Sequence, residues 1–218
     1  MAAMTLPIQV ASITTSLMAA GSIATMSFFD IPQAQSQPAS RSLPMIRWLF
    51  SRGSHIFPTT TMVSFTGFLY LAITTLPAGR AWSTIYKVAA NSPKVNAYIA
   101  AAFLNLGTGI FTERVMIPTN FSLIELNERL GGAKSEKSAK NKQYGTGDRS
   151  ADDSVNSKGD PTSQWTDLSG PQSQTDRKSS PEEDREANEL LTKFGRLNAI
   201  RACFPGIGGI VGLVVALM

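Results

Sequence analysis

The chain contains one cysteine and one histidine among its 218 residues, and this scarcity excludes several kinds of site. Because Cys203 is alone, no disulfide can form within the chain and no cluster of thiolates can hold a metal. Because His55 is alone, a metal or haem site built from several histidines is excluded too. We therefore predict no bound metal.

Familiar signatures of soluble enzymes are also missing. The sequence has no phosphate-binding loop, no dinucleotide-binding fingerprint and no nucleophile elbow. Its 20 basic and 16 acidic residues give a net charge of +4, which is small and scattered, so we expect no nucleic acid partner. Glycines recur between residues 206 and 212, but within an apolar stretch where close helix packing is the better interpretation.

Long apolar stretches without Asp, Glu, Lys or Arg are what the sequence does contain. They cover residues 6–29, 53–79, 95–112 and 202–218. Each is close to the roughly 20 residues that a helix needs to cross the hydrocarbon core of a bilayer. The sequence therefore predicts an all-α fold, a multi-pass membrane four-helix bundle in contact with a lipid bilayer.

The segment between the third and fourth apolar stretches is strongly polar. We expect residues 1–132 to hold the first three membrane helices and a short interfacial helix, with Ser122 and Glu125 at capping-box spacing and Gly131 and Gly132 as its stop. Residues 133–189 are rich in Ser, Lys, Asp and Gln, which predicts a long disordered loop. Deletion of residues 134–180 is therefore expected to leave insertion and most of the activity intact. Residues 190–218 then complete a single membrane domain.

Polar residues gather at particular ends of the apolar stretches. In an up-down-up-down bundle, the ends of helices one and three lie on the same side as the starts of helices two and four. The residues concerned are Asp30, His55, Glu113, Arg114, Asn120, Asn198 and Arg201. We expect them to share one cavity at one membrane face, a layout that suits a hydrophobic substrate with a few polar groups.

Two short runs resemble a known family. They are Phe111-Thr-Glu-Arg-Val-Met-Ile-Pro-Thr-Asn120-Phe-Ser-Leu and Leu197-Asn198-Ala-Ile-Arg201-Ala. They are similar to the fungal anthrone oxygenases, small four-helix membrane proteins of polyketide gene clusters, which carry Pro-Thr-Asn-x-x-Leu after the third helix and Asn-x-x-Arg at the start of the fourth. One departure is Phe194, where a tryptophan is common; aromatic stacking survives there, but the ring N–H does not.

The resemblance implies a function in fungal secondary metabolite biosynthesis. A member of this family would act as a monooxygenase that converts a polyketide anthrone to an anthraquinone with molecular oxygen and no cofactor. Its partners would be the anthrone, O2, the bilayer and, as a further interaction, other enzymes of the pathway.

This chemistry requires a base for the acidic methylene of the anthrone and donors for the resulting oxyanion. Histidine titrates near neutral pH, so His55 is our first candidate for the base, with Asp30 and Glu113 as alternatives. The substrate-binding candidates are Arg201, Asn120, Asn198 and Arg114. Structural interpretations stay open for all of them: helix caps for the two asparagines, an ion pair for Glu113 and Arg114, an interfacial position for His55, a solvated helix end for Asp30, and a structural or phosphate-facing role for Arg201.

Two other functions fit a four-helix membrane protein. One is a non-catalytic protein that organises partner enzymes, and the other is a small exporter of the product. Basic residues near the loop, among them Lys134, Lys137, Lys193 and Arg196, favour a cytosolic loop and termini on the other side. We expect the protein in the endoplasmic reticulum or a related endomembrane.

Overall fold

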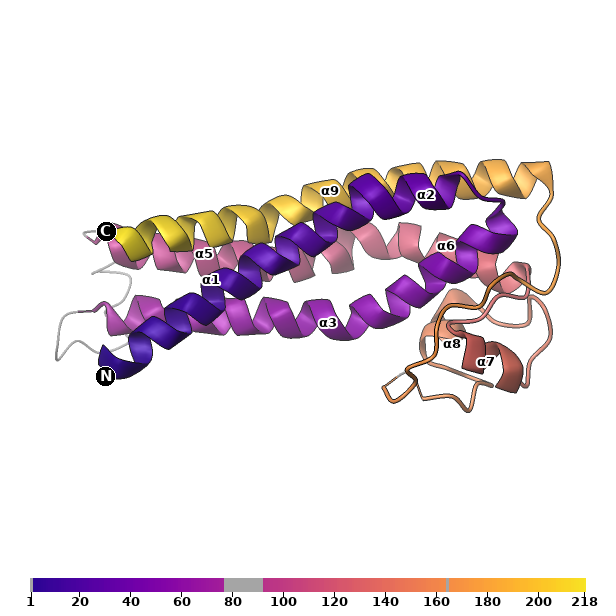
Figure 1. Ribbon diagram of the computed structural model, residues 1–218, viewed down its shortest axis with the longest axis horizontal. Coiled ribbons are helices and arrows are strands. Elements are labelled where there is room, and N and C mark those ends of the chain that lie inside the picture. The colour runs from indigo at the N-terminus through magenta and orange to yellow at the C-terminus, as the bar shows by residue number, and fades with distance from the viewer. Residues whose placement is uncertain (1, 77–91, 164) are drawn as a thin grey trace. The chain divides into compact units, whose positions relative to one another are not determined.

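A computed structural model describes residues 2–76, 92–163 and 165–218, and this part of the chain contains helices and turns but no strands (Figure 1). Four helical runs in it are long and apolar enough to cross a membrane: Thr5–Gln35, Ala39–Thr74, Pro93–Arg129 and Pro181–Leu217. The predicted all-α, multi-pass membrane fold with four membrane-spanning helices is therefore confirmed. Residues 77–79 of the second apolar stretch lie outside the described residues.

The chain divides into two compact units, and each is described by itself. The first unit comprises Met1–Ala24, Phe57–Arg114 and Ala199–Met218, and the second comprises Thr25–Ile56 and Val115–Asn198. The first unit takes residues from α1 (Ala2–Thr25), α3 (Ala39–Thr74), α5 (Pro93–Phe111) and α9 (Pro181–Leu217).

All four helices of the first unit contribute to one apolar core. Ile13 of α1, Phe68 of α3, Tyr98 of α5 and Val215 of α9 belong to the same buried cluster. On the outside of this unit, large apolar side chains are exposed, among them Leu6, Val10, Phe103, Ile110 and Ile210. Side chains of this kind are stable against lipid, because the hydrocarbon core is as apolar as they are.

Glycines of α9 allow its backbone to approach its neighbours closely. A Cβ atom on Gly212 would lie 2.3 Å from the ring of Phe68, and one on Gly208 would lie 2.6 Å from the amide nitrogen of Asn105. This confirms the packing interpretation of the glycines in the fourth helix. Gly21 of α1 differs, since a Cβ there would meet nothing within 4 Å.

In the part of the chain that the structure describes, two π-helical turns interrupt the long helices. They are η1 (Met26–Asp30) and η3 (Thr112–Met116), and each ends shortly before a proline, Pro32 or Pro118. Proline has no N–H to donate to the carbonyl four residues earlier, so the regular hydrogen-bond ladder cannot continue through it. Single π turns inside α-helices occur frequently at functional sites.

The second unit contains α2 (Ile31–Gln35), α6 (Ile117–Arg129) and the first part of α9. Helix α6 is amphipathic as predicted, with Leu123 and Leu126 buried, and it stops before Gly131, whose φ is +77°. The predicted capping box is wrong: α6 already begins at Ile117, and the Ser122 hydroxyl donates to the Pro118 carbonyl within the helix.

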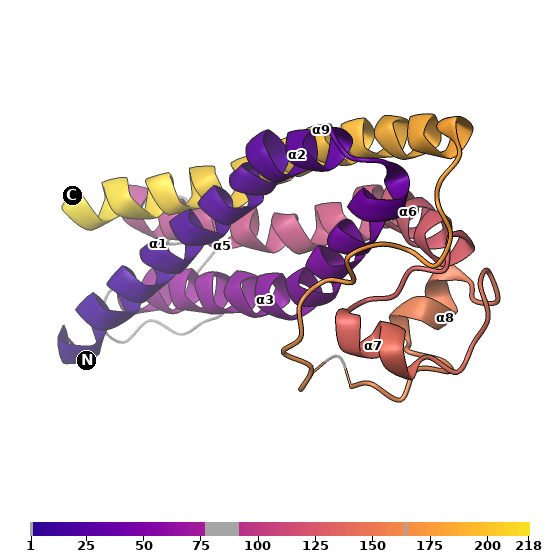
Figure 2. The same cartoon turned by 45° about the vertical axis from the view of Figure 1, so that its right-hand side comes forward.

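The polar segment of the second unit is folded, which corrects the expectation of a disordered loop. It contains α7 (Glu136–Asn141) and α8 (Ala151–Val155), each started by a serine that accepts a backbone N–H bond (Figure 2). Two buried ion pairs hold it, Lys134 with Asp160 at 3.0 Å and Arg149 with Glu128 at 2.7 Å. Composition was misleading because paired charges, and not aliphatic residues, form the interior of this segment.

Burial and hydrogen bonds lower the pKa values of Lys134 and Asp160, respectively. Burial lowers the pKa of the Lys134 ammonium group, although the hydrogen bond to Asp160 works in the opposite direction. For Asp160, burial would raise the pKa, but hydrogen bonds from Ser138, the backbone of Thr162 and Lys134 hold it below its ordinary value. The carboxylate therefore stays charged in the folded segment at neutral pH.

Candidate functional site

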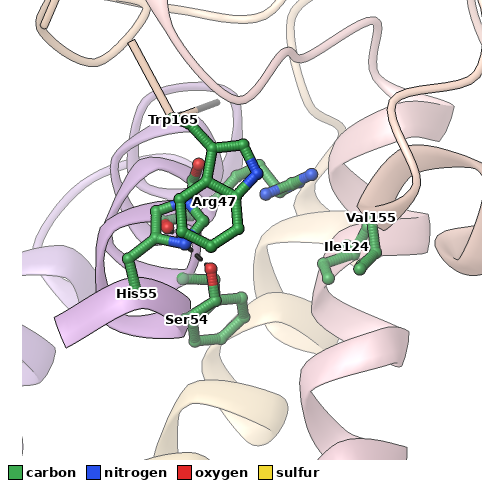
Figure 3. A pocket seen from close by; sticks show the side chains of 8 residues that line it. Arg47, Ser54, His55, Ile124, Val155 and Trp165 are labelled. Carbon is green, nitrogen blue, oxygen red and sulfur yellow. Dashed lines mark hydrogen bonds between the residues drawn. The ribbon is translucent and has the colours of Figure 1, made fainter. Parts of the chain in front are cut away.

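A pocket of about 210 Å³ lies within the second unit, around His55 (Figure 3). Its lining residues are Arg47, Phe50, Ser51, Ser54, His55, Ile124, Val155 and Trp165. They come from α3, α6, α8 and the folded polar segment. Apolar walls with a few polar groups pointing inward are the usual composition of a small-molecule site.

The indole of Trp165 lies over the imidazole of His55, as Figure 3 shows. The two ring centroids are 3.9 Å apart and the ring planes are tilted by 31°. His55 is half-buried, whereas Trp165 is 74% exposed. The predicted base therefore borders a pocket and is in contact with an aromatic residue that sequence reasoning had assigned to a disordered loop.

Arg47 is a buried cation of this pocket, and sequence reasoning missed it. Its Nε and Nη2 atoms donate to the hydroxyl of Ser154, and Nη2 also donates to the Ser154 carbonyl. The Ser154 hydroxyl donates in turn to Glu128 at 2.6 Å, and Glu128 accepts two bonds from Arg149. The polar segment thereby fixes the guanidinium group and leaves its Nη1 atom outside the interaction with Ser154.

The remaining predicted residues of the second unit are Asp30, Asn120 and Asn198. Asp30 is half-buried in η1, and Asn198 on α9 is fully buried. Within the described part of the chain, the buried Oδ1 of Asn120 and the neighbouring hydroxyl of Thr119 have no hydrogen-bond partner. Buried polar atoms are normally satisfied, so these two are candidates for contact with a ligand.

Phe194 occupies the position where the resemblance leads one to expect tryptophan. It is buried on α9 and packs edge to face against Phe50, a pocket residue, with the ring centroids 5.1 Å apart. An aromatic contact is therefore kept at this position of the second unit.

Arg201 belongs to the first unit, where it is only 6% exposed. Its Nη1 donates to the Thr112 hydroxyl at 3.4 Å and its guanidinium carbon lies 5.0 Å from the centre of the Phe57 ring. Among the described residues no carboxylate forms an ion pair with it, and its buried Nε has no hydrogen-bond partner. An unpaired buried charge costs on the order of several kcal/mol, so an oxyanion there would be strongly favoured.

Glu113 and Arg114 are also in the first unit, on the π turn η3, and both are exposed. The structure gives no ion pair between them in the residues it describes. In the same residues, no group of three or more His, Cys, Asp or Glu side chains could hold a metal ion.

The seven predicted residues are thus divided between the two units: Asp30, His55, Asn120 and Asn198 in the second, and Glu113, Arg114 and Arg201 in the first. That all of them share one cavity at one membrane face stays a prediction.

Comparison with known proteins decides the family. A model of the anthrone oxygenase family matches residues 47–211, well over half of the chain. The chain belongs to the anthrone oxygenase family. No curated protein and no solved structure matches it.

The anthrone oxygenase match covers both runs that carried the resemblance and also the folded polar segment. It begins at Arg47, the buried cation of the pocket, and it includes His55, Asn120, Asn198 and Arg201. Asp30 lies outside it. For an anthrone oxygenase, the second unit therefore offers an imidazole, a guanidinium group and aromatic walls around one pocket.

Proposed function

We propose that this protein oxidises a polyketide anthrone to the corresponding anthraquinone with molecular oxygen. The observation that supports this most directly is the position of His55, the single histidine of the chain, in a pocket with aromatic walls and a buried arginine. A planar tricyclic substrate with carbonyl and phenol groups suits such a lining, because its faces stack on aromatic rings and its edges accept and donate hydrogen bonds.

The reaction begins with proton removal. His55 takes one proton from the methylene group that lies between the two outer rings, and the electron pair left behind delocalises onto the carbonyl oxygen as an anthrolate. The anthrolate passes one electron to O2, and the resulting superoxide and anthrone radical combine at the former methylene carbon. The peroxide takes up a proton, giving a hydroperoxide.

Water is lost in the second half of the reaction. A base removes the remaining hydrogen of that carbon while the O–O bond breaks, so a second carbonyl forms and hydroxide leaves with a proton as water. One anthrone and one O2 thus give one anthraquinone and one water. The anthrolate itself supplies the electrons to oxygen, and we therefore propose a cofactor-independent reaction.

Hydrogen-bonding side chains are proposed to hold the substrate. Arg201 is suited to the oxyanion, since its buried charge has no acidic partner among the described residues. Asn120 is suited to a phenol, because its unpaired Oδ1 can accept a hydrogen bond from the phenol O–H. Asn198 and Arg114 complete the proposed set, with Asp30 and Glu113 as alternative bases.

We further propose that the protein works in the endoplasmic reticulum or a related endomembrane, with residues 133–189 in the cytosol. Basic residues that flank this segment favour that orientation. Other enzymes of the pathway could then deliver the anthrone from the same side.

The test uses the full chain in yeast microsomes with 1,8-dihydroxyanthrone as the probe substrate. Quinone formation is followed by absorbance, and the spontaneous oxidation is subtracted. His55→Ala is expected to lower the rate about 100-fold or more, the usual scale for a lost general base. His55→Gln is expected not to restore it, because an amide cannot accept the proton at neutral pH.

Two further variants distinguish the bases. Full activity of His55→Ala, with loss in Glu113→Gln or Asp30→Asn, would transfer the role of base to a carboxylate. No quinone above the spontaneous rate from the wild type would count against the proposed reaction.

A further inference from the structure

Residues 165–169 of the folded segment form a strap across one face of α3. The carbonyl of Ser169 accepts two hydrogen bonds from α3, one from the indole nitrogen of Trp48 at 2.9 Å and one from Arg52 at 3.0 Å. Trp48, Arg52 and His55 are four and three residues apart, so they follow one another along the same face of the helix. The strap therefore runs past His55.

The C-terminal end of the strap is firmly held. Asp167 accepts a hydrogen bond from the Ser135 hydroxyl and two more from the backbone and side chain of Ser169. Hydrogen bonds from Ser135 and Ser169 hold the pKa of Asp167 below its ordinary value, although burial would raise it. Residues 167–169 are thus fixed both to α3 and within the folded segment.

Trp165, at the other end of the strap, is held much more weakly. The residue is 74% exposed, and its described ring contact is with His55. At a centroid distance of 3.9 Å the two rings touch, so no third ring fits between them. Trp165 therefore covers one face of the imidazole without being buried itself.

We propose that Trp165 is a gate residue at the His55 pocket, and that a planar aromatic ligand displaces it when it binds. Before binding, the indole of Trp165 occupies the face of His55 on which the ligand's ring stacks. When the ligand binds, the indole moves aside while residues 167–169 stay fixed. The identity of the ligand as an anthrone rests on the proposed function. The contact between Trp165 and His55 is independent of that function.

The occupant follows from the chemistry of the place. Phe50, Ile124 and Val155 are apolar side chains in the lining of the same pocket, whereas Trp165 remains largely exposed. A planar tricycle has more apolar surface than one indole to bury against such walls, and the same lining offers the polar groups of Arg47 and Ser51 to its oxygens.

The first experiment measures how well His55 is covered, without any ligand. The full chain in nanodiscs is treated with diethyl pyrocarbonate, and carbethoxylation of the single histidine is followed by mass spectrometry. Trp165→Ala should raise the rate about 2- to 10-fold, the range that one aromatic contact represents. Trp165→Phe, which keeps a ring, should change it less. An unchanged rate in Trp165→Ala overturns the proposal.

The second experiment measures binding of 1,8-dihydroxyanthraquinone, a stable planar tricycle, to the same preparations. Without the competing indole, Trp165→Ala should bind the probe more tightly, by about 2- to 10-fold. Weaker binding in this variant would mean that Trp165 is a fixed wall of the site, and it would also overturn the proposal.

Leu168→Ala is the matched control for both measurements. Leu168 lies in the same strap and is 92% exposed, but it does not line the pocket. It should leave both the carbethoxylation rate and the probe affinity unchanged. Neither readout requires catalysis, so a wild type that forms no quinone refutes the proposed function alone, while unchanged reactivity in Trp165→Ala refutes the gate alone.

Discussion

Arg201 carries its charge inside the first unit with one long hydrogen bond, to Thr112, and a ring of Phe57 below it. Pro205, four residues later on α9, has no N–H to offer to the Arg201 carbonyl either. A membrane helix rarely contains a charged residue such as Arg201 unless the charge is paired or serves a function. Stability alone therefore gives no reason for an arginine at this position.

Replacing Arg201 separates the structural role from the functional one. Arg201→Met keeps the volume and removes the charge, so the melting temperature should stay the same or rise. The kcat/KM for the anthrone should fall about 10- to 100-fold, the scale of a lost hydrogen bond to a charged group. Differential scanning fluorimetry and the quinone assay measure the two effects.

The matched control is Arg196→Met, at an exposed position of the same helix, which should change neither quantity. A large drop in melting temperature for Arg201→Met, with normal activity in the protein that remains folded, would assign Arg201 to structure.

The sequence identified candidate site residues where a polar residue stands next to a long apolar stretch. His55 and Arg201 stand out because they are polar residues beside long apolar stretches. Arg47 and Trp165 could not be found in the same way. The pocket brings them together through contacts between residues more than 100 positions apart, and no periodicity in the sequence reports such a contact.

Among the helices, the glycines of α9 provide a direct test of close packing. Gly212→Ala places a methyl group 2.3 Å from the ring of Phe68, which must then move. We expect a loss of about 1–3 kcal/mol in the free energy of unfolding, as for other overpacked cores. Unfolding in mixed micelles with increasing amounts of a denaturing detergent measures it.

Gly21→Ala is the control for this prediction, because a Cβ at Gly21 meets nothing within 4 Å. It should be neutral or stabilise the protein by up to about 1 kcal/mol through helix propensity. Equal effects of the two substitutions would show that the close contact at Gly212 contributes little.

The sequence predicts that the membrane helices exist, but it does not predict the π turns within them. Four membrane helices follow from apolar length alone, and they were predicted. Pro32 and Pro118 were visible in the sequence, but a proline allows a kink, a break or a π turn, and tertiary packing selects among them. The π turns η1 and η3 were therefore not predicted, although they carry Asp30 and Glu113.

Acid should unfold the polar segment before it affects the apolar helices. Asp160 and Asp167 have folded pKa values below the ordinary one, so their contribution to stability is complete above about pH 3.9. It is lost as the pH falls through the lower folded values, since protonated Asp160 no longer balances the buried Lys134.

Hydrogen exchange followed by mass spectrometry should therefore show constant protection of residues 133–189 from pH 7 to about pH 4, after correction for intrinsic rates, and decreasing protection below that. Asp160→Asn should reduce this protection already at pH 7. Protection that persists at pH 2.5 would mean that the ion pair with Lys134 is dispensable.

For the molecule as a whole, removal of residues 134–180 separates insertion from function. The four membrane-spanning runs remain, so the truncated chain should still resist extraction from membranes by carbonate. Its quinone formation should fall at least about 10-fold, because the pocket loses Val155 and Arg47 loses its partner Ser154. Composition alone predicted that this deletion leaves most of the activity intact, and the structure predicts the opposite. A fully active truncated protein would contradict the prediction from the structure.

The membrane fold and the family could be predicted from the sequence because both depend on local patterns, namely apolar length and two short motifs. The folded state of residues 133–189 could not. Its interior contains charges and hydroxyl groups whose partners are distant in the sequence, as for Lys134 with Asp160 and Glu128 with Arg149. Compositional rules for disorder count apolar residues and do not detect such pairs.

An interior made of paired charges also constrains how this segment can evolve. Replacing Lys134 alone leaves a buried carboxylate without its counter-ion, and replacing Asp160 alone does the same to the ammonium group. Substitutions at these positions, and at Glu128 and Arg149, are therefore tolerated mainly as compensating pairs. Related sequences should show covariation at these two pairs of positions, while exposed positions such as Leu168 drift independently.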